Sequence, residues 1–85
     1  MTDGPLRVAI ADDSVLLRDG LVRLLSESGF EVVVAVGDAA ALLDSLEDTA
    51  VDVVVVDVRM PPTFTDEGIQ AALTMRERWP ALAIV

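Results

Sequence analysis

The chain has 85 residues, a formal net charge of −9, and neither cysteine, lysine nor histidine. Globular domains most often comprise about 100–150 residues, so this length allows a single small domain. The composition excludes disulfides and thiolate metal sites, removes the usual general base, and argues against nucleic-acid binding by this segment, because phosphate contacts need a basic face.

The apolar runs of the chain are short. None approaches the roughly 20 residues of a membrane-spanning helix, and the N-terminal Met-Thr-Asp-Gly-Pro lacks the basic and apolar regions of a signal peptide. We therefore expect a cytoplasmic protein without membrane contact. The side chains that remain available for chemistry are carboxylates, hydroxyls and six arginines. This set favours a hard cation such as Mg²⁺, which binds through oxygen.

Strand and helix patterns alternate along the chain without a linker or a low-complexity tract. Short apolar runs predict strands, and apolar residues spaced by three or four positions predict helices. The expected elements are a strand at 6–11, a helix at 14–28, a strand at 31–36, a helix at 38–47, a strand at 51–56, a helix at 68–78 and a strand at 81–85.

The first expected helix has recognisable end signals. Ser14 or Asp13 can cap its start, and Gly29 followed by Phe30 fits a Schellman-type stop. Four leucines at helical spacing indicate the helix itself: Leu17, Leu21, Leu24 and Leu25.

The strand at 51–56 contains four consecutive valines and is bounded by acids. Such a run, without polar alternation, is typical of a strand that is buried on both faces of a parallel sheet. Together with the alternating order of the elements, it predicts an α/β fold with a mostly parallel, doubly wound sheet and right-handed crossovers.

Acidic side chains follow two of the predicted strands. Asp12 and Asp13 come after the first strand, and Asp57 comes after the third. Functional groups of open α/β sheets lie just beyond the carboxyl ends of strands, so these carboxylates are expected to meet. They would repel one another unless a cation or protons neutralised them, which favours a divalent-metal site with a carboxylate nucleophile. Taken singly, a helix cap or a loop acid remains the alternative.

These acids and the residues that follow Asp57 resemble the receiver domain of two-component response regulators. The segment 55–68, Val-Val-Asp-Val-Arg-Met-Pro-Pro-Thr-Phe-Thr-Asp-Glu-Gly, is most similar to receivers of NarL/LuxR-type transcription regulators. The resemblance spans residues 1–85 and implies a flavodoxin-like sheet of order 2-1-3-4-(5). It also implies that DNA is bound by a helix-turn-helix output domain of the full-length protein.

The resemblance further implies a role for each matching residue. Asp57 would be the phosphoacceptor that takes a phosphoryl group from a sensor histidine kinase. Asp13 and Asp12 would bind Mg²⁺ together with Asp57, and the backbone carbonyl of Arg59 would complete the protein ligands. The dipeptide Met60-Pro61 would shape the loop over the site.

Two departures from the family pattern stand out. Residues 62–67 separate Pro61 from Gly68, a longer stretch than the family usually has. The family's hydroxyl after the fourth strand and its lysine after the fifth have no counterpart here. The chain is therefore expected to be a C-terminally incomplete receiver, its N-terminal two-thirds, truncated after the fourth strand.

Competing functions follow from these departures. The main alternative is a truncated, non-signalling fragment that self-associates, for example as a homodimer, through an uncovered sheet face and an unprotected edge strand. A phosphatase of the haloacid-dehalogenase kind is disfavoured, because Arg59 stands where that family needs a second aspartate. Dinucleotide binding is disfavoured too, because the turn at 11–14 has no glycine. The expectation is a phosphoacceptor that assists its own phosphorylation, not a turnover enzyme.

Overall fold

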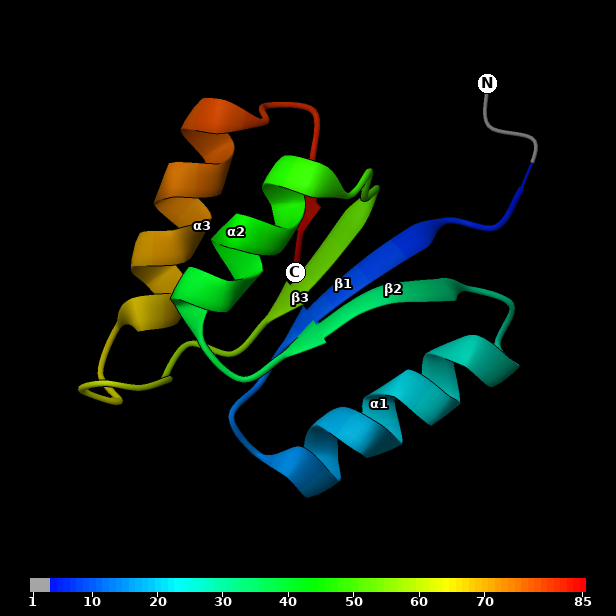
Figure 1. The fold of residues 1–85 in the computed structure, drawn as a ribbon, viewed down its shortest axis with the longest axis horizontal. Coiled ribbons are helices and arrows are strands. Elements are labelled where there is room, and N and C mark those ends of the chain that lie inside the picture. Colours follow the sequence, from blue (N-terminus) through cyan, green and yellow to red (C-terminus); the bar gives the residue numbers. More distant parts are fainter. Residues whose placement is uncertain (1–3) are drawn as a thin grey trace.

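The computed structural model describes residues 4–85, which form four strands and three helices in strict alternation (Figure 1). The elements are β1 (Arg7–Ala11), α1 (Val15–Glu27), β2 (Glu31–Val36), α2 (Ala39–Asp48), β3 (Val53–Val56), α3 (Glu67–Arg78) and β4 (Ala83–Ile84). Among these described residues, no helix is long and apolar enough to cross a bilayer.

The strands form one parallel sheet in the order β2-β1-β3-β4. Ile10 of β1 pairs with Ala35 of β2 on one side and with Val55 of β3 on the other. The expected parallel, doubly wound α/β architecture and its strand order are thus confirmed. The arrangement places the carboxyl ends of β1 and β3 side by side (Figure 1).

The last strand is shorter than the apolar pattern predicts. Residues 81–85 were expected to be extended, but β4 comprises only Ala83 and Ile84. The preceding residues form a turn in which the Leu82 amide donates to the Trp79 carbonyl at 3.0 Å. Pro80 has no amide hydrogen for a ladder, and this turn returns the chain to β3.

Helices α2 and α3 pack together over one face of the sheet and enclose the main core (Figure 1). Their buried apolar side chains interlock with alternate residues of the central strands, as expected when successive strand residues point to opposite faces. The buried members of this core are Ala9, Ala11, Val34, Leu42, Leu46, Val54, Met60, Ala71, Met75 and Leu82.

Helix α1 packs along β1 and β2 on the other face (Figure 1). Its ends follow the sequence signals. The Ser14 hydroxyl accepts the Leu17 amide at 3.2 Å, and at the other end the Phe30 amide donates to the Leu25 carbonyl at 3.0 Å. Gly29 has φ +97°, the left-handed conformation of a Schellman stop.

The four leucines at helical spacing in α1 differ in burial. Leu21 and Leu25 are half-buried against the sheet, but Leu17 and Leu24 are 54% and 58% exposed. Within the described chain, none of the residues of α1 is fully buried. The helix meets the sheet along one line and has no neighbouring helix beside it, so its flanking leucines stay in water.

Candidate functional site

Three carboxylates lie together beyond the carboxyl ends of β1 and β3. Oxygen atoms of Asp12, Asp13 and Asp57 all lie within 4.8 Å of one another. Asp57 comes from the end of β3, whereas the other two follow β1. The structure therefore brings together the side chains that the sequence placed at two strand ends.

Main-chain hydrogen bonds continue the sheet past its last ladder residues and fix these acids. The Asp12 amide donates to the Val36 carbonyl at 3.0 Å, and the Asp57 amide donates to the Ala11 carbonyl at 2.9 Å. Both Cα positions are thus set by the sheet itself. Because main-chain hydrogen bonds set these two positions, a substitution on the surface would change them little.

The three acids differ in burial and in their remaining partners. Asp12 is only 7% exposed, and its Oδ1 accepts the Ser14 amide at 2.9 Å. Asp13 is exposed and Asp57 is half-buried. Asp57 Oδ1 accepts the Arg59 amide at 3.5 Å, which is long for a hydrogen bond, so this contact holds the carboxylate only weakly.

Gly68 makes the site's tightest backbone contact. Its amide donates to the Val58 carbonyl at 2.8 Å. A Cβ at this position would lie 1.8 Å from the Asp57 carbonyl oxygen and 2.7 Å from the Val58 Cα. The start of α3 therefore rests against the main chain that carries Asp57. In the sequence Gly68 marked only the end of the stretch after Pro61, although a glycine at the start of a helix can indicate that another backbone segment approaches closely.

The segment after Asp57 is anchored in the core by Met60, and the carboxylate of Glu67 then holds it through hydrogen bonds. Met60 is 0% exposed, and its carbonyl accepts the Phe64 amide at 2.9 Å. Glu67 accepts the Thr63 hydroxyl, the Thr63 amide at 2.7 Å and the Thr65 amide at 3.1 Å. The Thr63 hydroxyl bond is the main cause that lowers the pKa of Glu67 to about 2. The long stretch at 62–67 is thus held by hydrogen bonds among its own residues.

Arg59 and Pro61 occupy this segment as well. The Arg59 side chain is exposed, and Pro61 is half-buried next to Met60. The expected roles of the Arg59 carbonyl as a metal ligand and of Met60-Pro61 in shaping the site stay predictions. The position of Met60 in the core gives the latter a physical basis.

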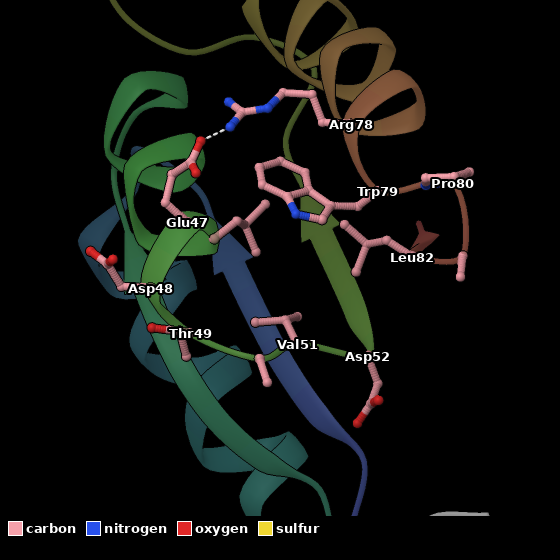
Figure 2. A pocket seen from close by; sticks show the side chains of 12 residues that line it. Glu47, Asp48, Thr49, Val51, Asp52, Arg78, Trp79, Pro80 and Leu82 are labelled. Carbon is pink, nitrogen blue, oxygen red and sulfur yellow. Dashed lines mark ion pairs between the residues drawn. The ribbon is translucent and has the colours of Figure 1, made fainter.

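A groove of about 670 Å³ lies at the opposite end of the sheet, between the last turns of α2 and α3 (Figure 2). Figure 2 shows Arg78 reaching across it to Glu47, with which it forms an ion pair. The guanidinium also lies 4.6 Å from the centroid of the Trp79 ring. Val51 and Asp52 line the groove at the start of β3, so it is separate from the carboxylate cluster.

Comparison with known proteins identifies relatives for almost the whole chain. Residues 8–85 match the family described as the response regulator receiver domain. The transcriptional regulatory protein PdtaR of Mycobacterium tuberculosis is 40% identical over 68 residues, which are 80% of this chain and 32% of that protein. Protein-glutamate methylesterase/protein-glutamine glutaminase 2 of Caulobacter vibrioides is 34% identical over 80 residues, 94% of this chain and 22% of the relative.

A solved structure has the same fold. The isolated REC domain of RcsB from Salmonella enterica serovar Typhimurium, determined with the phosphomimetic BeF3−, superimposes with a TM-score of 0.84 at 27% identity. The match covers 95% of this chain and 59% of that one. The present chain therefore spans a minor part of the curated relatives and a little over half of that solved domain.

Proposed function

Because the chain belongs to the response regulator receiver domain family over residues 8–85, we propose that Asp57 accepts a phosphoryl group from a sensor histidine kinase. The observation that carries this proposal is the cluster of Asp12, Asp13 and Asp57, whose oxygens lie within 4.8 Å of one another. Phosphoryl transfer to a carboxylate requires a nucleophilic oxygen and a site for a cation that offsets the negative charges.

The donor set fits Mg²⁺. It consists of carboxylate oxygens from Asp12, Asp13 and Asp57, to which the backbone carbonyl of Arg59 would add another oxygen, and such ligands suit a hard cation. When bound, Mg²⁺ would supply positive charge that offsets the repulsion between carboxylates and phosphoryl oxygens. The buried Asp12 and the exposed Asp13 would hold the ion at the mouth of the site, beside the nucleophile.

The chemical step uses the chain's own carboxylate. An oxygen of Asp57 attacks the phosphorus of a phosphohistidine, the new P–O bond forms, and the P–N bond breaks to leave histidine. The product is an aspartyl phosphate, a covalent acyl phosphate. The sheet hydrogen bond of the Asp57 amide keeps the nucleophile in place while its side chain stays available from solvent.

In a longer protein that carries this receiver, phosphorylation would control an output. We propose that this output is transcription regulation, because PdtaR is a transcriptional regulatory protein, and that it uses a DNA-binding domain, because the response regulator RcsB forms a complex with DNA. We propose the cytoplasm as its location. Methylesterase relatives carry a different activity, so an enzymatic output is the competing outcome. The net charge of −9 makes direct DNA contact by residues 1–85 unfavourable.

A second candidate function is self-association of this domain without signalling. The observation in its favour is the apolar surface of α1, where Leu16 is 86% exposed and Leu17 and Leu24 are more than half exposed. Strand β4 also forms one edge of the sheet. Light scattering at high protein concentration tests this function: a dimer would support it, and a monomer would exclude it.

Intact-mass analysis tests the main proposal. The folded chain is incubated with Mg²⁺ and a small phosphoryl donor, beside Asp57→Asn and the matched control Asp44→Asn, which changes an exposed acid of α2. We expect a Mg²⁺-dependent phosphoryl adduct on the wild-type chain and on the control but not on Asp57→Asn. A folded chain without any adduct would contradict the proposal.

A further inference from the structure

Arg18 reaches from α1 back to the carboxylate site. Its Nη1 donates to the Asp12 backbone carbonyl at 2.8 Å. Its own amide donates to the Ser14 carbonyl at 2.8 Å, in the first turn of the helix. The side chain is half-buried, unlike the exposed Arg23 on the same helix. One arginine of α1 is therefore tied to the site, and another is left in solvent.

The β2–α2 connection leaves room for this guanidinium. A Cβ at Gly37 would lie 3.0 Å from Arg18 Nη1 and 3.9 Å from the Asp12 carbonyl oxygen. A contact of 3.0 Å is tighter than most Cβ contacts, so with an alanine here the guanidinium at the end of the flexible Arg18 side chain would have to shift by a few tenths of an ångström. The slot is thus bounded by α1, by the residues after β1 and by Gly37.

The carbonyl that Arg18 holds belongs to the peptide joining Asp12 to Asp13. The rest of Asp12 is already fixed, since its amide donates to Val36 and its Oδ1 accepts the Ser14 amide. Holding the carbonyl as well sets the plane of that peptide, and hence the direction in which Asp13 leaves the strand. Asp13 is exposed, whereas Asp12 is buried and Asp57 is half-buried.

We propose that Arg18 is a positioning residue for the cation site: it orients the Asp12–Asp13 peptide so that both carboxylates face Asp57. This inference rests on the proposed function, since it concerns the same site. Second-layer residues that orient metal ligands typically change metal affinity by about 10–100-fold when they are removed. Arg18 acts through the Asp12 backbone carbonyl, to which its Nη1 donates.

The sign of the effect separates positioning from electrostatics. A guanidinium beside the cluster repels a cation, so loss of its charge alone would strengthen Mg²⁺ binding. Loss of positioning would weaken it. Arg18→Met removes both the charge and the donors while keeping much of the apolar stem. Its effect on Mg²⁺ affinity therefore has opposite signs under the two readings.

The test is a calorimetric Mg²⁺ titration without any phosphoryl donor. We expect Arg18→Met to bind Mg²⁺ about tenfold more weakly than the wild-type chain. The matched control, Arg23→Met, makes the same change of charge on the same helix and should bind as the wild type does. An Arg18→Met chain that binds Mg²⁺ equally or more tightly would overturn the inference.

A second pair of variants keeps Arg18 and tests its position without removing the side chain. Gly37→Ala should shift the guanidinium by a few tenths of an ångström and weaken Mg²⁺ binding, whereas Gly20→Ala, which has nothing within 4 Å, should leave Mg²⁺ binding unchanged. Emission of Trp79 reports folding independently, because this residue lies at the other end of the sheet. Equal weakening of Mg²⁺ binding by Gly37→Ala and by Gly20→Ala would overturn the inference.

Phosphoryl uptake distinguishes failure of the inference from failure of the proposed function. We expect Arg18→Met to need about tenfold more Mg²⁺ for half-maximal uptake but to reach the wild-type maximum at saturation. If the wild-type chain forms an adduct and Arg18→Met has the same Mg²⁺ dependence, only the role of Arg18 is wrong. If the wild-type chain neither binds Mg²⁺ nor forms an adduct, both proposals are wrong.

Discussion

The two ends of α3 are held by different kinds of contact, although main-chain bonds cross both ends of the sheet, as from Asp57 to Ala11 and from Asp52 to Arg7. At the carboxyl end of the sheet, the first turn of α3 contains Gly68, which rests against backbone atoms. At the amino end, α3 finishes in a contact between long side chains, the ion pair of Arg78 with Glu47. A rigid backbone contact thus lies beside Asp57, and adaptable side chains close the other end.

This difference indicates how a small domain fixes a reactive site. A carboxylate cluster repels itself, and its members stay close only if the surrounding structure holds them. Backbone hydrogen bonds are less adjustable than pairs of long side chains, which rotate and are screened by water. Substitutions at the carboxyl end should therefore cost more stability than substitutions at the amino end.

The largest effect is expected for Met60→Ala. The Met60 side chain is 0% exposed and packs in the core under α2 and α3, so its truncation leaves a cavity beside the segment that follows Asp57. Loss of a buried methionine side chain costs about 2–5 kcal/mol in the free energy of unfolding. Urea unfolding measures it. Leu16→Ala, at a position 86% exposed, serves as control and should change the free energy by less than about 0.5 kcal/mol.

Gly68→Ala should have the next largest effect. The added methyl group would lie 1.8 Å from the Asp57 carbonyl oxygen, so either the start of α3 or the main chain at Asp57 must shift. We expect a loss of about 3 kcal/mol in the free energy of unfolding, together with slower phosphoryl uptake at saturating Mg²⁺.

Gly20→Ala provides the matched comparison for Gly68→Ala. Gly20 lies inside α1 with nothing within 4 Å, and alanine there should stabilise the chain by about 0.5–1 kcal/mol. Equal effects of the two substitutions on stability would show that backbone contact at Gly68 is not the constraint.

Much of this architecture could be predicted from the sequence. Alternating apolar patterns predicted the parallel, doubly wound sheet, and the resemblance to receiver domains implied its strand order. The rule for strand ends brought Asp57 to Asp12 and Asp13. Periodicity identifies residues that share a face but not what covers that face, so it could not show that Leu17 and Leu24 stay exposed.

The contacts that refine the site could not be predicted in the same way. Arg18 reaches the Asp12 carbonyl because the first turns of α1 lie beside the residues after β1 and beside Gly37. Gly68 contacts the Asp57 carbonyl because the first turn of α3 lies against the main chain after β3. Each depends on distances between segments that no sequence spacing specifies. The residues were visible in the sequence, but their neighbours were not.

Glu67→Gln should have a smaller effect that depends on pH. The Thr63 hydroxyl, followed by amides of Thr63 and Thr65, lowers the pKa of Glu67 from the ordinary 4.5 to about 2. The folded pKa lies below the unfolded one, so the ionised group stabilises the fold fully above pH 4.5. That contribution is lost as the pH falls towards 2.

Urea midpoints of the wild-type and Glu67→Gln chains check this prediction across that range. We expect the wild-type advantage to be constant above pH 4.5 and to shrink below it. Glu77→Gln, at an exposed position of α3, is the control and should show no such change. An advantage that stays constant down to pH 2 would contradict the assigned role of the Glu67 carboxylate.

Arg78→Met, at the amino end, should have the smallest effect. The Arg78 and Glu47 side chains are each 46% exposed, and solvent screening leaves such pairs worth about 0–1 kcal/mol. We expect urea unfolding to show a loss within that range, comparable to the exposed control Arg76→Met, and phosphoryl uptake to be unchanged. A larger loss would mean that the contact with Trp79 holds α3 as firmly as the backbone contacts hold the other end, and the contrast between the two ends would disappear.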